Sequence, residues 1–203
     1  MFIKRILLLT GMALAAVALS VPAMASADPK WYSDETGEFV PEGFHAELHA
    51  VGELTFDAPG GIKVGPCEVT VGGLAVNENA MASGTVTNPI VSQECETNAE
   101  GCTAKPTLLN APWDVTGNTT TTGSPGVEFK GITATIHFIG TCPVPLTTIS
   151  FKGTATALNC VPECMTFEGH QDDLALEAPF PALPVDITGT LYLTQPMTLG
   201  PSS

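Results

Sequence analysis

The sequence predicts an all-β fold, an antiparallel β-sandwich of Ig-like or jelly-roll-like kind that is cross-linked by disulfides. Apolar and polar residues alternate with a period of two in several stretches, which is typical of strands that bury one face. Twenty glycines and 17 prolines separate these stretches, and six cysteines provide an even number for cross-links. Helical periodicity is absent after the first 27 residues. Seven to nine short strands with turns between them are typical of a sandwich.

The alternation is clearest in four stretches, 45–56, 132–138, 148–157 and 185–194. Weaker strand candidates lie at 67–75, 84–91, 102–109 and 112–116. Between Phe129 and Ile132 the apolar residues change phase, so we predict a β-bulge at Gly131. The low-complexity segment 117–126 is predicted to be a hairpin loop, with a linker between two halves as the alternative.

The N-terminal segment 1–27 has the features of a signal peptide. Lys4 and Arg5 precede the apolar stretch 6–21, and Ala25-Ser26-Ala27 provides small residues for signal peptidase. A retained membrane anchor is the alternative, but the apolar stretch is short for a span and is interrupted by polar and helix-breaking residues. We therefore expect a secreted, extracellular protein with no stable membrane insertion after cleavage.

Two further parts follow the predicted signal peptide. Residues 28–43 mix aromatic and acidic residues without a clear period, and we expect an acidic lead-in that is partly flexible. Residues 44–203 carry the alternating stretches and are expected to form a single β-sandwich domain.

The charge of the chain restricts its partners. After residue 27, five lysines and no arginine face 21 carboxylates, which gives a net charge near −16. Binding to nucleic acid or to anionic membranes depends on cations that displace counterions, so neither partner is expected. A neutral glycan or a basic protein surface suits this charge better.

The six cysteines are expected to form disulfides, because they lie in an exported chain and no Cys-x-x-Cys pair suggests zinc. Proximity along the chain predicts three pairs, Cys95 with Cys102, Cys160 with Cys164, and Cys67 with Cys142. Six cysteines allow fifteen connectivities, so the other pairings stay open.

Six short motifs follow one another along the middle of the chain. They are Cys67-Glu68-Val69-Thr70, Gly84-Thr85-Val86-Thr87, Cys95, Gly101-Cys102-Thr103, Pro112-Trp113-Asp114-Val115 and Gly140-Thr141-Cys142. The set resembles a group of secreted, β-rich, cysteine-containing proteins of actinobacteria, over about residues 67–160. The resemblance implies export, β-structure and disulfides, and it implies no activity.

One row of residues has the composition of a metal site. His45, Glu47 and His49 alternate along a predicted strand, so their side chains would lie on one face, about 7 Å apart. Imidazole and carboxylate groups can bind a transition metal, with a further ligand such as His137. The alternative is an ordinary solvent-facing row, which we expect here. The polar segment 168–173 lacks the pattern of a calcium loop and is predicted to be a solvated turn.

No catalytic signature is present in the sequence. The Gly-x-Ser-x-Gly elbow, the His-Glu-x-x-His pair and the phosphate-binding glycine loop are all missing, so we predict no catalytic residue and no cofactor. The expected function is that of a secreted, non-catalytic binding or envelope-associated module. The alternatives are a secreted, carboxylate-dependent hydrolase that acts on glycans, and a metal-binding protein that uses the row from His45 to His49.

Overall fold

A computed structural model describes residues 28–58, 61–91, 94–119, 124–143, 147–160, 163–177, 183–195 and 197–201. The predicted signal peptide lies outside these residues. The described residues form thirteen strands, and no helix among them is long and apolar enough to cross a membrane. The strands are β1 (Pro29–Ser33), β2 (Glu38–Phe39), β3 (Ala46–Ala58), β4 (Ile62–Glu78), β5 (Met81–Val91), β6 (Cys95–Glu96), β7 (Cys102–Leu109), β8 (Trp113–Thr119), β9 (Pro125–Gly140), β10 (Thr148–Cys160), β11 (Cys164–Leu176), β12 (Pro184–Leu193) and β13 (Met197–Pro201).

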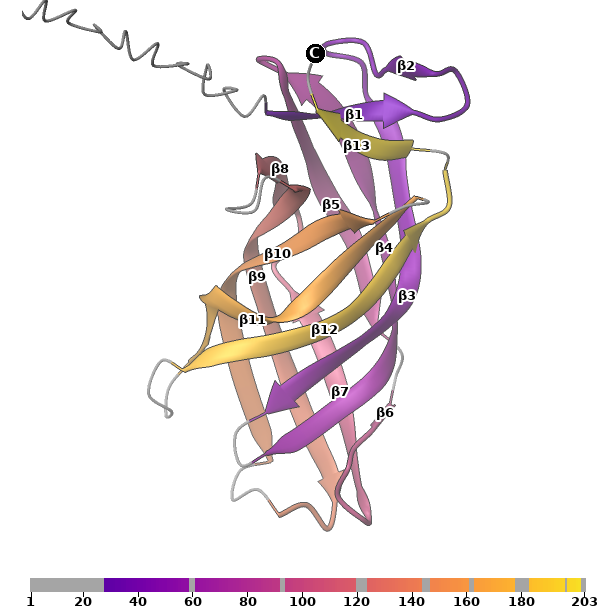
Figure 1. The fold of residues 1–203 in the computed structure, drawn as a ribbon. Helices are drawn as coiled ribbons and strands as arrows, with labels where there is room; N and C mark the ends of the chain where they lie inside the picture. The colour runs from indigo at the N-terminus through magenta and orange to yellow at the C-terminus, as the bar shows by residue number, and fades with distance from the viewer. Residues whose placement is uncertain are drawn as a thin grey trace, which may run out of the picture.

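Ten of the strands form one antiparallel sheet that closes on itself (Figure 1). Their order is β10-β11-β12-β3-β4-β5-β8-β9-β7-β6, and β10 also pairs with β9. Strand β10 is the first in this order and β9 is near its end, so the pairing between them closes the sheet. The all-β class, the antiparallel pairing and the disulfides are therefore confirmed, but the two facing sheets of the predicted sandwich are not, because one curved sheet encloses the interior.

Strands β7 and β8 lie one after the other beside β9. Residues of β7 pair with the second half of β9, and residues of β8 pair with its first half. Between them, Asn110 adopts a φ of 56°. Strand β5 pairs with β8 only from Ser83 to Val86, so the rest of β5 lies beside β7 without a described ladder.

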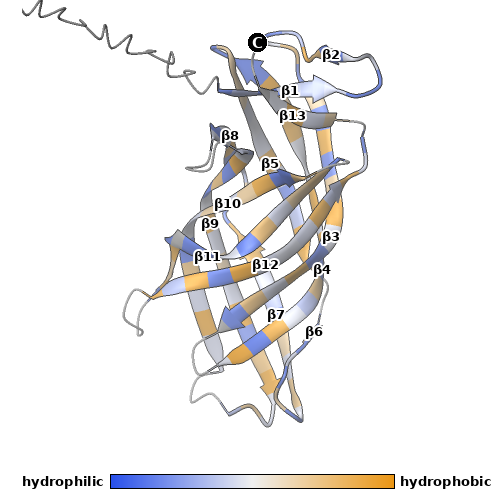
Figure 2. Cartoon of the chain, viewed as in Figure 1, coloured by the Kyte–Doolittle hydropathy of each residue, from blue (hydrophilic) through white to orange (hydrophobic). Residues whose placement is uncertain are grey.

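The interior of the closed sheet holds the apolar face of the predicted strands. Figure 2 shows apolar and polar residues in alternating bands along the strands. Each of the four clearest stretches buries its apolar set, including Leu48, Ile136, Phe151 and Leu191. The period of two therefore located these strands correctly.

The predicted bulge at Gly131 is confirmed. Gly153 and Ala155 of β10 lie two residues apart, but their partners on β9, Ile132 and Phe129, lie three apart. Gly131 has a φ of 75°, a conformation that residues with a side chain rarely adopt. The extra residue lets both Phe129 and Ile132 face the interior.

The segment 117–126 joins two paired strands, as the loop interpretation predicts. The β8–β9 ladder runs as far as Thr119 opposite Pro125. Residues 120–123 lie outside the described residues. The segment is thus a hairpin connection within one sheet.

Residues 28–43, the predicted acidic lead-in, contain two short strands. Strand β1 pairs along its whole length with β13 near the C-terminus, and with β2 on its other side. This three-stranded sheet lies across one end of the closed sheet (Figure 1), and Trp31 is only 1% exposed. The pairing joins the two ends of the described chain, so no local pattern indicates it.

The structure contains three disulfides, Cys67–Cys95, Cys102–Cys142 and Cys160–Cys164. The predicted Cys160–Cys164 pair is confirmed. The predicted pairs Cys95–Cys102 and Cys67–Cys142 are wrong. Three disulfides indicate an oxidising environment.

Strand pairing explains the two corrected bridges. Cys102 lies opposite Gly140 in the β7–β9 ladder, which brings it close to Cys142. Strand β6 lies against β4, and Thr97 forms a bridge with Val64 there, so Cys95 reaches Cys67. Neighbours across strands thus determine these bridges, rather than neighbours along the chain.

Candidate functional site

The predicted metal row does not converge on one point. His45 lies just before β3, while Glu47 and His49 lie within it, and His45 and Glu47 line different surface hollows. Nδ1 of His49 lies 3.0 Å from Oγ1 of Thr194. Among the described residues, no group of three histidine, cysteine, aspartate or glutamate side chains is arranged to hold a metal ion.

His137, considered above as a further ligand, lies on β9. Its Nδ1 is 2.9 Å from Oγ1 of Thr148 on the adjacent strand β10. The interactions described for this side chain therefore link it to its strand neighbour.

The polar segment 168–173 lies within β11, so the predicted solvated turn is wrong. The prediction failed because of Gln171. Its polar side chain is buried at an inward position of the strand, where alternation leads one to expect an apolar residue. Its Oε1 accepts a hydrogen bond from the Thr156 N–H at 2.7 Å, and its Nε2 donates to the Thr156 carbonyl at 3.3 Å. The side-chain amide of Gln171 thus forms hydrogen bonds with β10 at the point where the β10–β11 register shifts.

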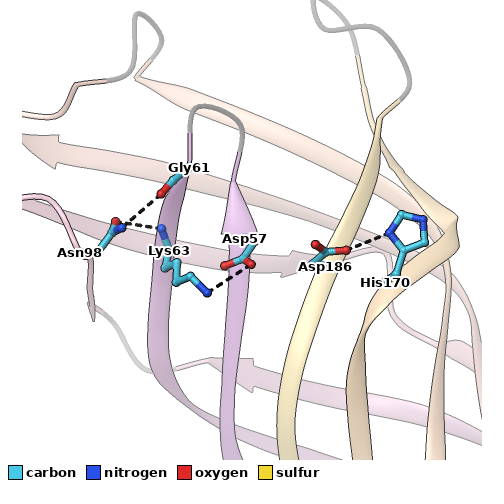
Figure 3. Close-up of polar contacts among 6 residues, drawn as sticks. All are labelled: Asp57, Gly61, Lys63, Asn98, His170 and Asp186. Atoms are coloured by element: carbon cyan, nitrogen blue, oxygen red, sulfur yellow. Dashed lines mark hydrogen bonds and ion pairs between the residues drawn. The ribbon is translucent and has the colours of Figure 1, made fainter.

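Four charged or ionisable side chains follow one another across neighbouring strands near one end of the sheet (Figure 3). They are Lys63 on β4, Asp57 on β3, Asp186 on β12 and His170 on β11. Nζ of Lys63 is 3.5 Å from Oδ2 of Asp57, and Nδ1 of His170 is 3.0 Å from Oδ1 of Asp186. Asp57 and Asp186 face each other in the ladder, and like charges at such positions are unfavourable. The Lys63 ammonium offsets the charge of Asp57, and Asp186 has a hydrogen bond with the His170 ring on its other side.

The two carboxylates of this charged row are partly exposed. Oδ1 of Asp57 is buried without a hydrogen-bond partner among the described residues, but the side chain as a whole is 38% exposed. Neither Asp57 nor Asp186 lines any of the hollows described below. Ion pairs at this degree of exposure contribute little to stability.

A hollow of about 490 Å³ lies on the outer face of β4, β5 and β8. Its charged lining residues are Glu78, Asp114 and Lys130, and His45 also lines it. Lys130 pairs with Glu128 at 3.3 Å. The hollow mixes charges of both signs, so its electrostatics favour no single class of ligand.

A second hollow of about 390 Å³ has charge of only one sign. We call it the acidic pocket; it is lined by Ser33, Glu35, Thr36, Glu38, Phe39, Val40, Pro41, Phe44, Ala46, Glu47, Gln195 and Met197. The three glutamates are exposed, no lysine, arginine or histidine lies in the lining, and the Phe44 ring is 60% exposed. The acidic pocket therefore places an exposed aromatic ring among carboxylates of one sign.

The Phe39 ring of the acidic pocket is held by neighbouring side chains. The Phe39 ring packs edge-on against Tyr32, with centroids 5.6 Å apart. Nζ of Lys30 lies 5.9 Å from the Phe39 centroid, within the range of a cation–π contact. One side of Phe39 therefore already interacts with a cation.

Asn77, buried on β4, fixes the chain that forms the floor of this pocket. Its Oδ1 accepts a hydrogen bond from the Trp31 N–H at 2.8 Å, and its Nδ2 donates to the carbonyls of Val40 at 2.7 Å and Trp31 at 3.0 Å. Its own carbonyl accepts from the Gly43 N–H at 2.9 Å. Sequence reasoning missed this arrangement; the tryptophan and phenylalanine among the acids of residues 28–43 were the only local signal.

The interior of the closed sheet contains a small cavity of about 50 Å³. Its lining is entirely apolar and comprises Leu54, Phe56, Val69, Val71, Val91, Leu108, Trp113, Phe129, Ile132, Phe151, Ala155, Phe167, Ile187 and Leu191. Seven of these residues, Leu54, Phe56, Ile132, Phe151, Ala155, Ile187 and Leu191, lie in the four stretches of clearest alternation, but alternation does not reveal a space between them.

Comparison of the chain with protein-family models, with curated proteins and with solved structures found no match. The resemblance to secreted actinobacterial proteins therefore stays a prediction.

Proposed function

We propose that the protein is a secreted, non-catalytic binding module, and that its acidic pocket binds a basic segment of a partner protein. The observation that carries the proposal is the one-sided charge of this pocket. Glu35, Glu38 and Glu47 lie around Phe39 and Phe44, and the lining contains no cation. The net charge near −16 after residue 27 would attract a basic partner from a distance.

The charged end and the apolar stem of a lysine or arginine side chain each match a feature of this pocket. Its charged end can pair with the glutamates, and a cation over a phenylalanine ring gains further attraction. Its apolar stem can cover the exposed Phe44 ring while the charge stays near water. The contact of Lys30 with Phe39 is an example of this chemistry within the same molecule.

A non-catalytic role is supported by the exposure of the three glutamates. Acid and base catalysis by a pair of carboxylates relies on environments that give the two groups different pKa values. Export is supported by the predicted signal peptide and by the three disulfides.

The test is binding of a lysine- and arginine-rich peptide to protein produced from the full-length chain. Calorimetric titration at low, physiological and high salt should show affinity that falls as salt rises, because exposed charges are screened. The double variant Glu38→Gln/Glu47→Gln should weaken binding at least tenfold, and Phe44→Ala at least threefold.

The matched control is Glu53→Gln/Glu96→Gln, which removes the same charge from exposed positions outside the pocket. It should weaken binding less than threefold. An equal loss in both double variants would show that only the overall charge attracts the peptide. Salt-independent binding of a neutral oligosaccharide at Phe44 would replace the basic partner with a glycan.

A further inference from the structure

We infer that the closed sheet has a second binding site, in which the end of an unbranched aliphatic chain enters the interior between β5 and β7. This site is separate from the acidic pocket and does not depend on the function proposed for it. It combines an interrupted ladder, an apolar cavity and an exposed apolar rim.

The ladder is interrupted where β8 gives way to β7. Strand β5 pairs with β8 from Ser83 to Val86, opposite Thr116 to Trp113. Beyond Val86, residues 87–91 of β5 lie beside β7, and no pairing between these two strands is present among the described residues. The wall of the closed sheet therefore lacks its usual backbone hydrogen bonds at this point.

Two lining residues of the cavity are partly exposed near this interruption. Of its fourteen lining residues, twelve are buried, and only Val91 and Leu108 are half-buried. Val91 lies on the unpaired part of β5, and Leu108 lies on β7. We therefore place the mouth of the proposed site at these two residues.

The rim of the mouth is also apolar. Ile90 is 61% exposed and Leu109 is 39% exposed, and each is the chain neighbour of one of the two mouth residues. Large apolar side chains exposed around an apolar opening favour an apolar ligand.

The lining and the size of the cavity limit the ligand class. The lining residues offer no polar side chain, so a charged or hydroxylated group would lose its hydrogen bonds inside. A volume of about 50 Å³ accepts only the last few carbons of a chain, while the following carbons would lie along Ile90 and Leu109. The head group would remain in water, and a neutral one avoids repulsion by the acidic protein.

The test uses the two tryptophans of the chain as reporters. Trp113 lines the cavity, while Trp31 lies beneath the N-terminal sheet, where its Nε1 donates to the Ser83 carbonyl. Undecanol with a terminal bromine should quench Trp113 fluorescence at saturation, because heavy atoms quench rings that they contact. Plain undecanol should compete with it.

Single-tryptophan variants locate the bound bromine. Trp31→Phe should retain saturable quenching, and Trp113→Phe should lose most of it. Quenching of both tryptophans to the same extent, or quenching that does not saturate, would overturn the inference.

A matched pair of surface variants tests the mouth. Ile90→Ser at the rim should weaken binding at least fivefold, while Ile139→Ser, an exposed isoleucine on β9 outside the cavity lining, should leave binding unchanged. Circular dichroism confirms that both variants are folded. The Glu38→Gln/Glu47→Gln protein should bind the alcohol with unchanged affinity. The proposal for this site and the proposal for the acidic pocket are therefore tested independently.

Discussion

At the residue scale, Asn77 is the polar group on which the arrangement of the N-terminal sheet depends. It is 2% exposed, and its side-chain amide bonds to Trp31 and Val40 of the adjoining segment. A buried polar group is stable only when its hydrogen bonds are satisfied, and here both ends of the amide are used. Asn77 thus joins the N-terminal sheet to the closed sheet.

We predict that Asn77→Ala destabilises the protein by about 2–3 kcal/mol, because it leaves the Trp31 N–H and the Val40 carbonyl buried without partners. Urea unfolding measures the loss. The control Asn88→Ala, at an exposed position on β5, should change stability by less than about 0.5 kcal/mol. Equal effects of the two variants would contradict the assigned role of Asn77.

The sequence predicted which residues are buried where apolar residues recur at every second position of a strand. Leu48, Phe151 and Leu191 lie in stretches whose alternation predicts one buried face, and all three are buried. Asn77 and Gln171 were missed because each is a polar residue at a buried position. Their partners lie on other strands, so no pattern within one strand identifies them.

At the element scale, two disulfides close long segments of the sheet and one closes a single turn. The Cys102–Cys142 bridge spans 40 residues and the Cys160–Cys164 bridge spans 4. The constraint on the unfolded chain grows with the length of the closed loop, so the longer bridge is worth more.

We predict that Cys102→Ser/Cys142→Ser lowers the melting temperature more than Cys160→Ser/Cys164→Ser does. The chain-entropy relation gives about 4 kcal/mol for the first pair and about 2 kcal/mol for the second. Thermal melting followed by circular dichroism compares the variants. A larger loss from the short bridge, or peptide mapping that joined Cys95 to Cys102, would contradict the pairing described here.

Local elements were predicted better than their partners. Alternation located strands from residue 45 to residue 194, and the phase change located the bulge at Gly131. The β1–β13 ladder and the Cys67–Cys95 bridge were missed, because both join segments that are distant in the sequence. Proximity along the chain predicts disulfide pairing poorly when the pairing of strands determines which cysteines lie close together.

At the scale of the whole molecule, the acidic charge determines which large partners the protein avoids. We predict no measurable binding to duplex DNA or to anionic lipid vesicles at physiological salt, since five lysines cannot neutralise a row of phosphates. Fluorescence anisotropy and vesicle co-sedimentation measure these affinities. Tight binding that weakens as salt rises would show that the lysines gather into a basic site.

The closure of the sheet could not be predicted from the sequence. A sandwich and a closed sheet both require alternating inward and outward residues, so the same pattern fits both. The interior cavity and the acidic pocket depend on that closure and on the N-terminal sheet, and they were therefore missed as well.

The short contact between β5 and β8 also has a consequence for amide hydrogen exchange. Four registered pairs join these strands, compared with twelve between β3 and β4. Local opening is easiest where the fewest hydrogen bonds break, so we expect the amides that bridge β5 and β8 to exchange with solvent before those of the β3–β4 ladder. The Cys67–Cys95 bridge joins β4 to β6, and the Cys102–Cys142 bridge joins β7 to the residue pair after β9, so neither of them holds β5 to β8. Opening would then begin between β5 and β8, while amides in the longer ladders of the closed sheet stay protected from exchange.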